Sequence, residues 1–313
     1  MNRNSRGHCG RLALAALVAA LPLLSPALAR ADDDDDAPKG PGAVAEEESI
    51  ETENIFGFTL GTDTGEKGEK EVSFTLDGRF GRLGGSYAAY TGEAEFEYAV
   101  TDDFKVAVGA ALNAFDISRV PGFDDVSGGG FGGAFFELKY RFLDRKTSPF
   151  GLSLSVEPEW ARYDEASGER GTAYGIEFRL AADWELSKDF LFAAVNLVYA
   201  PEWERETEDF ITSWSAGSGL ELSGAVTAQV FKDIFIGGEV RYLAAYEGAS
   251  FGDRQGWAVY LGPSIYAQVT ENFFVKATWS FQVAGQADLP WNSNLDLVNF
   301  DRNQGRLQVG FSF

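Results

Sequence analysis

The chain has 313 residues, of which 48 are acidic and 26 are basic. An excess of negative charge on this scale disfavours binding to phosphate groups, so nucleic acid is excluded as a partner. The only Cys and the only His, Cys9 and His8, lie within the first nine residues. The remainder of the chain therefore has no disulfides, no thiol nucleophile and no histidine base.

Residues 1–31 have the pattern of a secretory signal peptide. Arginines precede an apolar run from Leu12 to Leu24, and small residues then offer cleavage after Ala29 or Ala31. The run is too short to span a bilayer comfortably as a helix. Four basic residues and no acidic residue lie in this segment, so its removal leaves a net charge of about −26.

Residues 32–53 are predicted to form a disordered acidic leader. They contain ten acidic residues against one lysine, with Pro, Gly and Ala between them, and such a composition buries too little apolar surface to fold. Calcium binding by the run Asp32 to Asp36 is the alternative. Consecutive aspartates do not converge on one ion as calcium ligands must, so a solvated tail is favoured.

Residues 54–69 are predicted to form a short periplasmic or plug-like segment. Apolar and small residues alternate from Ile55 to Thr62, through Phe56, Phe58 and Leu60. If this stretch were counted as a strand, the predicted barrel would have thirteen strands instead of twelve. Single-chain bacterial barrels have even numbers of strands.

From about residue 70 the chain repeats one unit, in which two strands of alternating polarity flank a short polar turn and a longer loop follows. Between residues 93 and 112, for example, glutamates alternate with Ala94, Phe96 and Tyr98, a turn follows, and a second alternating run begins at Phe104. Helical spacing is not sustained. The twelve predicted strands lie near 70–82, 86–100, 103–117, 130–143, 149–162, 172–187, 190–201, 214–231, 234–247, 255–270, 273–284 and 304–313.

The connections alternate between short turns and long loops. The long connections are predicted near 117–129, 163–172, 200–213, 245–255 and 284–303, and the glycines from Gly128 to Gly133 are interpreted as part of an exterior loop. This arrangement predicts an all-β fold, a transmembrane antiparallel up-and-down β-barrel of about twelve strands over residues 70–313, with fourteen as the alternative. Pro158 and Pro263 fall inside strands, where we expect bulges or rim positions.

A soluble β-sandwich would also show alternating strands. The apolar face of this chain, however, is rich in aromatic residues that gather near strand ends, which is typical of a surface in contact with lipid. The predicted members of the two interfacial girdles are Trp160, Trp184, Tyr199, Trp203, Trp214, Tyr242 and Trp257.

The end of the chain resembles the closing strand of bacterial outer-membrane β-barrels. The residues that carry this resemblance are Leu307, Val309, Phe311 and Phe313, with an aromatic carboxy-terminus. The resemblance implies location in the bacterial outer membrane, contact with its lipid, and recognition of this strand by the barrel-assembly machinery.

A second resemblance lies at the start of the barrel region. The residues Phe56 to Thr59 and the stretch from Gly61 to Glu71 are similar to uncharacterised proteobacterial barrel proteins that are grouped with transporters of aromatic compounds. This resemblance implies a carrier for small hydrophobic compounds.

The inward face of the barrel is predicted to be charged and predominantly acidic, and it must therefore be wet, ion-paired or both. Glu93, Glu95 and Glu97 stack in one column, which basic residues on adjoining strands neutralise or which forms a cation-binding constriction. The predicted pore-lining residues are Glu93, Glu95, Glu97, Lys105, Glu137, Lys139, Arg141, Glu157, Glu159, Glu177, Arg179, Glu221, Glu239 and Arg241.

These patterns favour a narrow pore with an acidic lumen for the passive passage of small solutes, with cations preferred. A non-conducting structural or surface-interaction barrel and the hydrophobic carrier are the alternatives. No enzymatic activity, metal centre or cofactor is expected, because the chain after residue 9 lacks His and Cys, and acid pairs such as Glu157 with Glu159 are too common along these strands to indicate glycoside chemistry.

Overall fold

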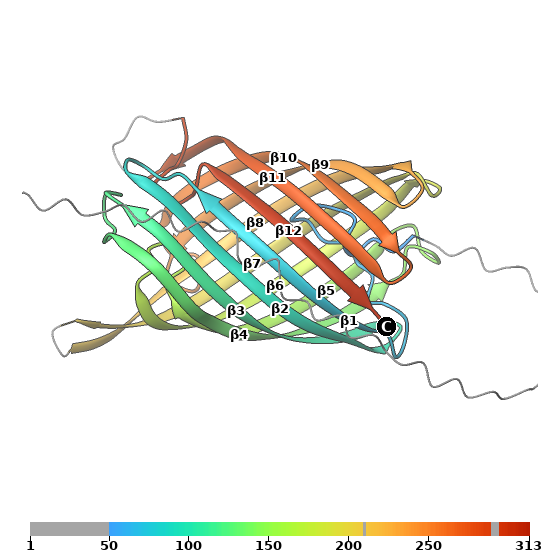
Figure 1. The fold of residues 1–313 in the computed structure, drawn as a ribbon, viewed down its shortest axis with the longest axis horizontal. Coiled ribbons are helices and arrows are strands. Elements are labelled where there is room, and N and C mark those ends of the chain that lie inside the picture. Colours follow the sequence, from blue (N-terminus) through green and yellow to red (C-terminus); the bar gives the residue numbers. More distant parts are fainter. Residues whose placement is uncertain (1–49, 209–210, 289–293) are drawn as a thin grey trace, which may run out of the picture. The chain divides into compact units, whose positions relative to one another are not determined.

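A computed structural model describes residues 50–208, 211–288 and 294–313. The predicted signal peptide and nearly all of the predicted acidic leader lie outside these residues. Residues 48–313 belong to one compact unit, in which twelve strands form a closed barrel (Figure 1). The strands are β1 (Lys70–Phe80), β2 (Ser86–Thr101), β3 (Phe104–Ser118), β4 (Val126–Leu143), β5 (Gly151–Tyr163), β6 (Arg170–Ser187), β7 (Leu191–Glu208), β8 (Ile211–Phe231), β9 (Ile234–Glu247), β10 (Arg254–Thr270), β11 (Phe273–Ala287) and β12 (Asn303–Ser312).

Every strand pairs antiparallel with its neighbours in sequence, and β1 pairs with β12 to close the barrel. The closing register runs from Glu71 opposite Ser312 to Phe80 opposite Asn303. Closure satisfies the hydrogen-bonding groups that an open sheet edge would expose, which a strand crossing hydrocarbon requires. The predicted antiparallel barrel of twelve strands is confirmed, and the alternative count of fourteen is excluded.

The two ends of the barrel differ in their connections. Short turns join β2 to β3, β8 to β9 and β10 to β11, and the C-terminus lies at this end, which we call the turn end (Figure 1). The opposite end, the loop end, has longer connections such as residues 119–125 and 288–302. In bacterial barrels the short turns are periplasmic, so the turn end faces the periplasm.

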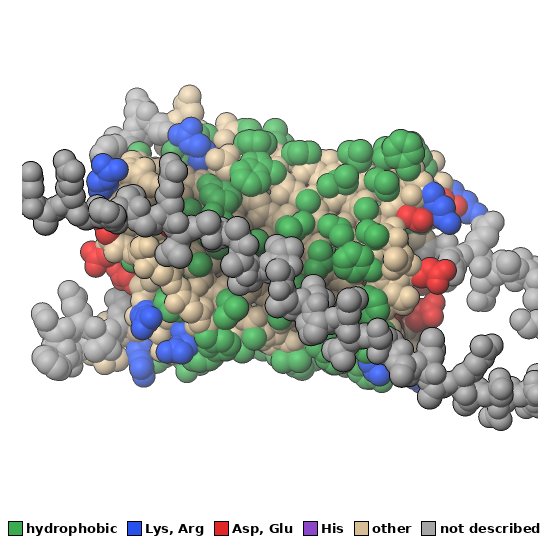
Figure 2. All heavy atoms as spheres, in the orientation of Figure 1, with side chains coloured by type: hydrophobic (Ala, Val, Ile, Leu, Met, Phe, Trp, Pro, Cys, Tyr) green, Lys and Arg blue, Asp and Glu red, His purple; other side chains and the backbone are tan. Residues whose placement is uncertain are grey.

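The outer surface of the barrel is apolar. Figure 2 shows hydrophobic side chains spread along the visible wall, with charged side chains gathered toward the two ends. Phe74, Leu112, Phe136 and Ile265 are among the large apolar side chains that remain about half exposed, an arrangement that favours hydrocarbon over water. The part of the chain that the structure describes contains no helix long and apolar enough to cross a bilayer.

Aromatic pairs lie toward both ends of this surface. Trp184 packs against Phe150 near the turn end, with ring centroids 5.9 Å apart. Tyr242 stacks on Trp257 near the loop end, at 6.1 Å. Their positions agree with the interfacial girdles predicted from the sequence.

The prediction of loops at 200–213 and at Gly128–Gly133 was wrong. Strands β7 and β8 pair as far as Glu208 opposite Ile211, and the glycines belong to β4. A Cβ atom at Gly129 would lie 2.0 Å from the carbonyl oxygen of Asn113 on β3. The glycine run therefore permits close approach of neighbouring backbones within the sheet, which is a common reason for glycine inside a strand.

The expectation of bulges or rim positions at the two strand prolines was also wrong. Pro158 and Pro263 lie inside β5 and β10, and each leaves a short gap in one ladder, toward β4 and β11 respectively, without a change of register. At the second gap, the Thr278 hydroxyl donates to the Pro263 carbonyl oxygen at 2.9 Å. The hydroxyl thus satisfies the carbonyl oxygen of Pro263 where the ladder to β11 is interrupted.

Candidate functional site in the barrel lumen

All fourteen charged residues predicted to line a pore occupy inward-facing positions. Each alternates with outward-facing neighbours, as Glu95 and Glu97 do with Phe96 and Tyr98, which are 40% and 37% exposed. The alternation of a strand separates the two faces in this way. The structure divides the fourteen into two groups, one against residues 50–64 near the turn end and one farther toward the loop end.

Residues 50–64, which we call the inner segment, pack inside the barrel near the turn end (Figure 1, blue). Ile55 and Phe56 are almost fully buried. They form an apolar cluster with inward-facing residues of β7 to β11, including Phe192, Phe235 and Tyr266. Burial of two large apolar side chains stabilises this position by roughly 3–6 kcal/mol relative to an exposed segment.

Glu53 joins the inner segment to β3 and β4. One of its carboxylate oxygens lies 2.6 Å from the ammonium nitrogens of both Lys105 and Lys139. The Lys139 ammonium also donates to the Gly61 carbonyl oxygen at 3.1 Å. Burial alone would raise the pKa of Glu53, but the two ammonium groups outweigh this effect and hold the pKa below its ordinary value of 4.5.

Asp63 forms a second anchor. Its carboxylate accepts hydrogen bonds from Arg141 at 3.1 Å, from Arg145 at 2.6 Å and from the Thr52 amide at 2.7 Å. Burial acts to raise the pKa of Asp63. The Arg145 guanidinium and the Thr52 amide together outweigh this effect, so the pKa lies below its ordinary value of 3.8. Beside it, Asp183 of β6 accepts bonds from the Thr62 amide and hydroxyl.

The tip of the inner segment is held by β9 and β12. The Glu239 carboxylate accepts hydrogen bonds from the amides of Phe58 and Thr59 at 2.8 and 3.0 Å. The guanidinium groups of Arg241 and Arg306 lie 4.0 and 4.8 Å from the centroid of the Phe58 ring, within the range of cation–π attraction. The tip is therefore fixed by both charge and ring contacts.

Beyond the tip, the wall formed by β2 to β5 carries carboxylates without basic partners. Within the described residues, none of the following forms an ion pair: Glu93, Glu95, Glu137, Glu157 and Glu159. Glu157 also lies directly opposite Glu177 of β6 in the strand register. Like charges in opposed positions repel, and no basic side chain among the described residues pairs with the carboxyl groups of this wall.

The arginines of the opposite wall are each paired. Arg179 lies 2.8 Å from Glu177, Arg241 lies 2.9 Å from Glu221, and Arg306 lies 2.6 Å from Asp77. Guanidinium–carboxylate pairs of this kind neutralise one another. The carboxyl groups of the interior that lack a basic partner are therefore concentrated on β2 to β5.

The predicted column of Glu93, Glu95 and Glu97 is divided by these contacts. Glu97 is paired with Lys105, which it shares with Glu53. The other two glutamates have no basic partner among the described residues. Glu97 is thus neutralised by a basic residue of the adjoining strand, whereas Glu93 and Glu95 are not.

A second apolar cluster lies inside the barrel near the loop end. Tyr87, Phe115, Ile117 and Tyr163 form an inward-facing apolar cluster. Nearby, a segment of the β11–β12 connection folds inward, and the buried pair Arg82 and Asp301 holds it, with 2.9 Å between the charged atoms. The acidic wall lies between this cluster and the inner segment.

Several residues of the site were missed by the sequence reasoning. Glu53 was assigned to the disordered leader because its neighbours are acidic, and Asp63 was placed in the plug-like segment without a role of its own. Arg306 was overlooked although it alternates with Leu307, a signal that does indicate an inward position. The described residues contain no cluster of three or more potential metal ligands.

Comparison with known proteins places these features in a family. A family model described as a family of unknown function, DUF6662, matches residues 48–313. No curated protein sequence matches the chain.

Solved structures share the fold. The COG4313 outer membrane channel from Pseudomonas putida F1 is 13% identical with a TM-score of 0.51, over 80% of this chain and 98% of that chain. The β domain of the Bordetella autotransporter BrkA is 12% identical with a TM-score of 0.50, over 79% and 100%. The NanC porin is 14% identical with a TM-score of 0.43, over 77% and 98%. The chain has the fold of bacterial outer-membrane β-barrels.

Proposed function

Because the chain belongs to DUF6662, a family of unknown function, we propose its function from its own lumen: a narrow, cation-preferring channel of the outer membrane that the inner segment closes. The observation that carries the proposal is the set of acidic side chains without basic partners on β2 to β5, which lie in the interior of a closed transmembrane barrel. A low-dielectric wall around like charges concentrates counter-ions, so these groups attract cations and repel anions.

We propose that residues 50–64 act as a plug. They lie inside the turn end and are held by charged groups, Glu53 and Asp63, at one end and by Glu239 at the tip. Contacts of this kind are breakable without unfolding the barrel, since the strands pair with one another and not with the plug. Passage of solute then requires displacement of the plug.

A planar-bilayer measurement tests both parts. The wild-type chain is expected to open rarely, and the Glu53→Gln variant more often, with a reversal potential in a KCl gradient that shows cation preference. Replacing Glu93, Glu95 and Glu157 together by glutamine should move that potential toward zero. Glu271→Gln, in the exposed turn between β10 and β11, is the control and should leave the potential unchanged.

A non-conducting barrel is the second candidate, and one observation favours it: the interior is occupied by the inner segment near one end and by the apolar cluster near the other. The absence of channel events in both the wild-type chain and Glu53→Gln, at every voltage, would support this candidate and end the channel proposal. Anion preference would contradict the role of the acidic wall.

The hydrophobic-carrier alternative has a narrower basis. The residues that carry the resemblance to transporters of aromatic compounds, Phe56 to Thr59, are buried parts of the inner segment. Their chemistry is accounted for by contacts with the barrel wall, including those of Phe58 with two arginines. These four residues therefore support closure of the lumen by the inner segment more directly than they support binding of a hydrophobic solute.

A further inference from the structure

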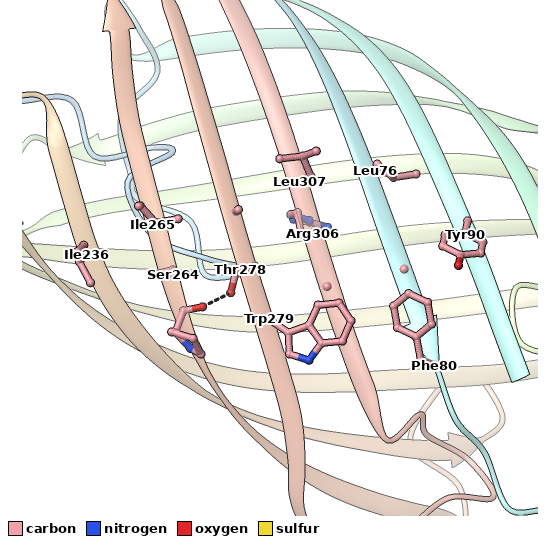
Figure 3. A pocket seen from close by; sticks show the side chains of 14 residues that line it. Leu76, Phe80, Tyr90, Ile236, Ser264, Ile265, Thr278, Trp279, Arg306 and Leu307 are labelled. Carbon is pink, nitrogen blue, oxygen red and sulfur yellow. Dashed lines mark hydrogen bonds between the residues drawn. The ribbon is translucent and has the colours of Figure 1, made fainter. Parts of the chain in front are cut away.

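The outer wall of the barrel contains a groove that the proposed channel does not use. It encloses about 560 Å³ over β9 to β12, β1 and the adjoining part of β2 (Figure 3). Apolar side chains that face away from the lumen form its sides, and five of them are 40–48% exposed: Leu76, Ile236, Ile265, Trp279 and Leu307. The groove is thus continuous with the lipid-facing belt.

Two glycines and small neighbours create the groove. Gly78 of β1 lies directly opposite Gly305 of β12, and both occupy outward positions, so the wall has no side chain there. Trp279 lies opposite Gly305 on the other side, and Ala277 and Pro263 extend the floor across β11 and β10. The hollow therefore follows from the residues and the register of four consecutive strands, β10 to β12 and β1.

Aromatic rings fix one side of the groove. The rings of Phe80 and Trp279 stack with their centroids 5.3 Å apart and a 15° angle between planes. A Cβ atom at Gly78 would lie 2.7 Å from the Phe80 ring, and one at Gly305 would lie 2.6 Å from the Trp279 ring. The rings lean over the glycines, as Figure 3 shows for Phe80 and Trp279 beside Tyr90. Neither glycine position has room for a side chain while the rings are in place.

Two polar residues that border the groove, Arg306 and Thr278, direct their side chains into the lumen, where both are already engaged. The Arg306 guanidinium forms two bonds to the Asp77 carboxylate, at 2.8 and 2.6 Å. The Thr278 hydroxyl donates to the carbonyl of Pro263. A polar ligand would have few partners, whereas hydrocarbon needs only the apolar surface. The surrounding medium at this wall is also hydrocarbon.

We propose that this groove binds one acyl chain of a membrane lipid and retains it more tightly than the rest of the barrel surface. Two features favour a lipid chain as the occupant. The groove opens onto the lipid-facing belt, and its lining offers dispersion contacts on several sides instead of one. Ala94 and Val108 are exposed on the same outer face but do not border this groove.

The test uses the purified mature barrel, extracted in mild detergent from membranes and washed before native mass spectrometry. Wild type is expected to retain one lipid per barrel. Ala277→Phe, which fills the floor, should reduce the retained fraction at least tenfold. Ala94→Phe, on the exposed outer face of β2, is the matched control and should retain lipid as wild type does.

A second measurement keeps the test decisive if Ala277→Phe fails to fold. A photo-reactive benzoylphenylalanine is placed at Ile236, in the groove, or at Val108, outside it, and the washed protein is irradiated. Lipid adducts are expected at the first position only. The proposal would be overturned by equal adducts at both positions, by the absence of retained lipid in wild type, or by retention that Ala277→Phe does not affect. It would also be overturned if the groove held a non-lipid small molecule or a second copy of the chain.

Discussion

The carboxylate of Glu53 lies 2.6 Å from the ammonium group of Lys105, and this pair joins a segment that precedes the barrel to the inward face of its third strand. The two side chains are 13% and 5% exposed. The same carboxylate oxygen contacts Lys139 on β4. One glutamate thus connects the inner segment to two adjacent strands, and its loss should affect closure of the lumen more than any single apolar contact.

Glu53→Gln should release the inner segment. The change removes the negative charge that Lys105 and Lys139 share, and it leaves both ammonium groups buried. Breaking a buried ion pair in this way costs about 3 kcal/mol or more. The equilibrium between bound and released segment should shift at least a hundredfold. Because the chain after Cys9 contains no cysteine, a Leu60→Cys background allows the release to be measured as the rate of maleimide labelling.

The control for this experiment is Glu66→Gln in the same background. Glu66 is exposed and lies just outside the inner segment, so its charge change should leave the labelling rate unchanged. Equal rates in the two variants would show that Glu53 does not hold the segment.

The contribution of Glu53 and Asp63 to attachment of the inner segment should be lost in the acidic range. Both Glu53 and Asp63 have pKa values below their ordinary values of 4.5 and 3.8. Their stabilising effect is therefore fully present above the ordinary values, and it is lost as the pH falls through the lowered ones. The labelling rate of Leu60→Cys, divided by that of a free thiol at the same pH to correct for the falling thiolate fraction, should rise below about pH 3.8. The same acid transition in the Glu53→Gln variant would contradict the role of the Glu53 carboxylate.

Gly129→Ala should destabilise the barrel. The added Cβ atom would lie 2.0 Å from a backbone oxygen of β3, so β4 must move, at a cost of about 1–3 kcal/mol. Gly92→Ala is the matched control, since its nearest atom lies at 3.9 Å. The midpoint of the heat-dependent gel shift of the folded barrel measures the effect. A midpoint that falls equally in both variants would point to the general cost of changing a strand glycine instead.

Phe313→Ala should impair assembly in cells more than folding in detergent. Phe313 is 57% exposed, and its backbone pairs with Lys70 of β1, so loss of the ring leaves barrel closure intact. We expect several-fold less assembled protein in outer membranes and an unchanged yield of refolding in detergent micelles. A parallel loss in both assays would mean that the ring serves stability and not recognition by the assembly machinery.

The alternation of apolar and polar residues determined the barrel itself. In β2, Glu93, Glu95 and Glu97 alternate with Ala94, Phe96 and Tyr98, and a strand that separates such sides must have lipid or a core on one face and a polar space on the other. The number of strands, their order and the inward position of the charged residues were accessible in this way, because local periodicity and short turns leave few other topologies.

What lies inside the barrel was decided by the tertiary structure. The sequence could not place Glu53 against Lys105, because the two residues are 52 positions apart and the acidic neighbours of Glu53 are typical of a solvated tail. The position of the glycines in β4 and the groove above Gly78 and Gly305 depend in the same way on the register between strands distant in sequence. Periodicity reports which face a residue occupies, whereas pairing of charges and hollows in a wall arise only when particular residues of different strands meet.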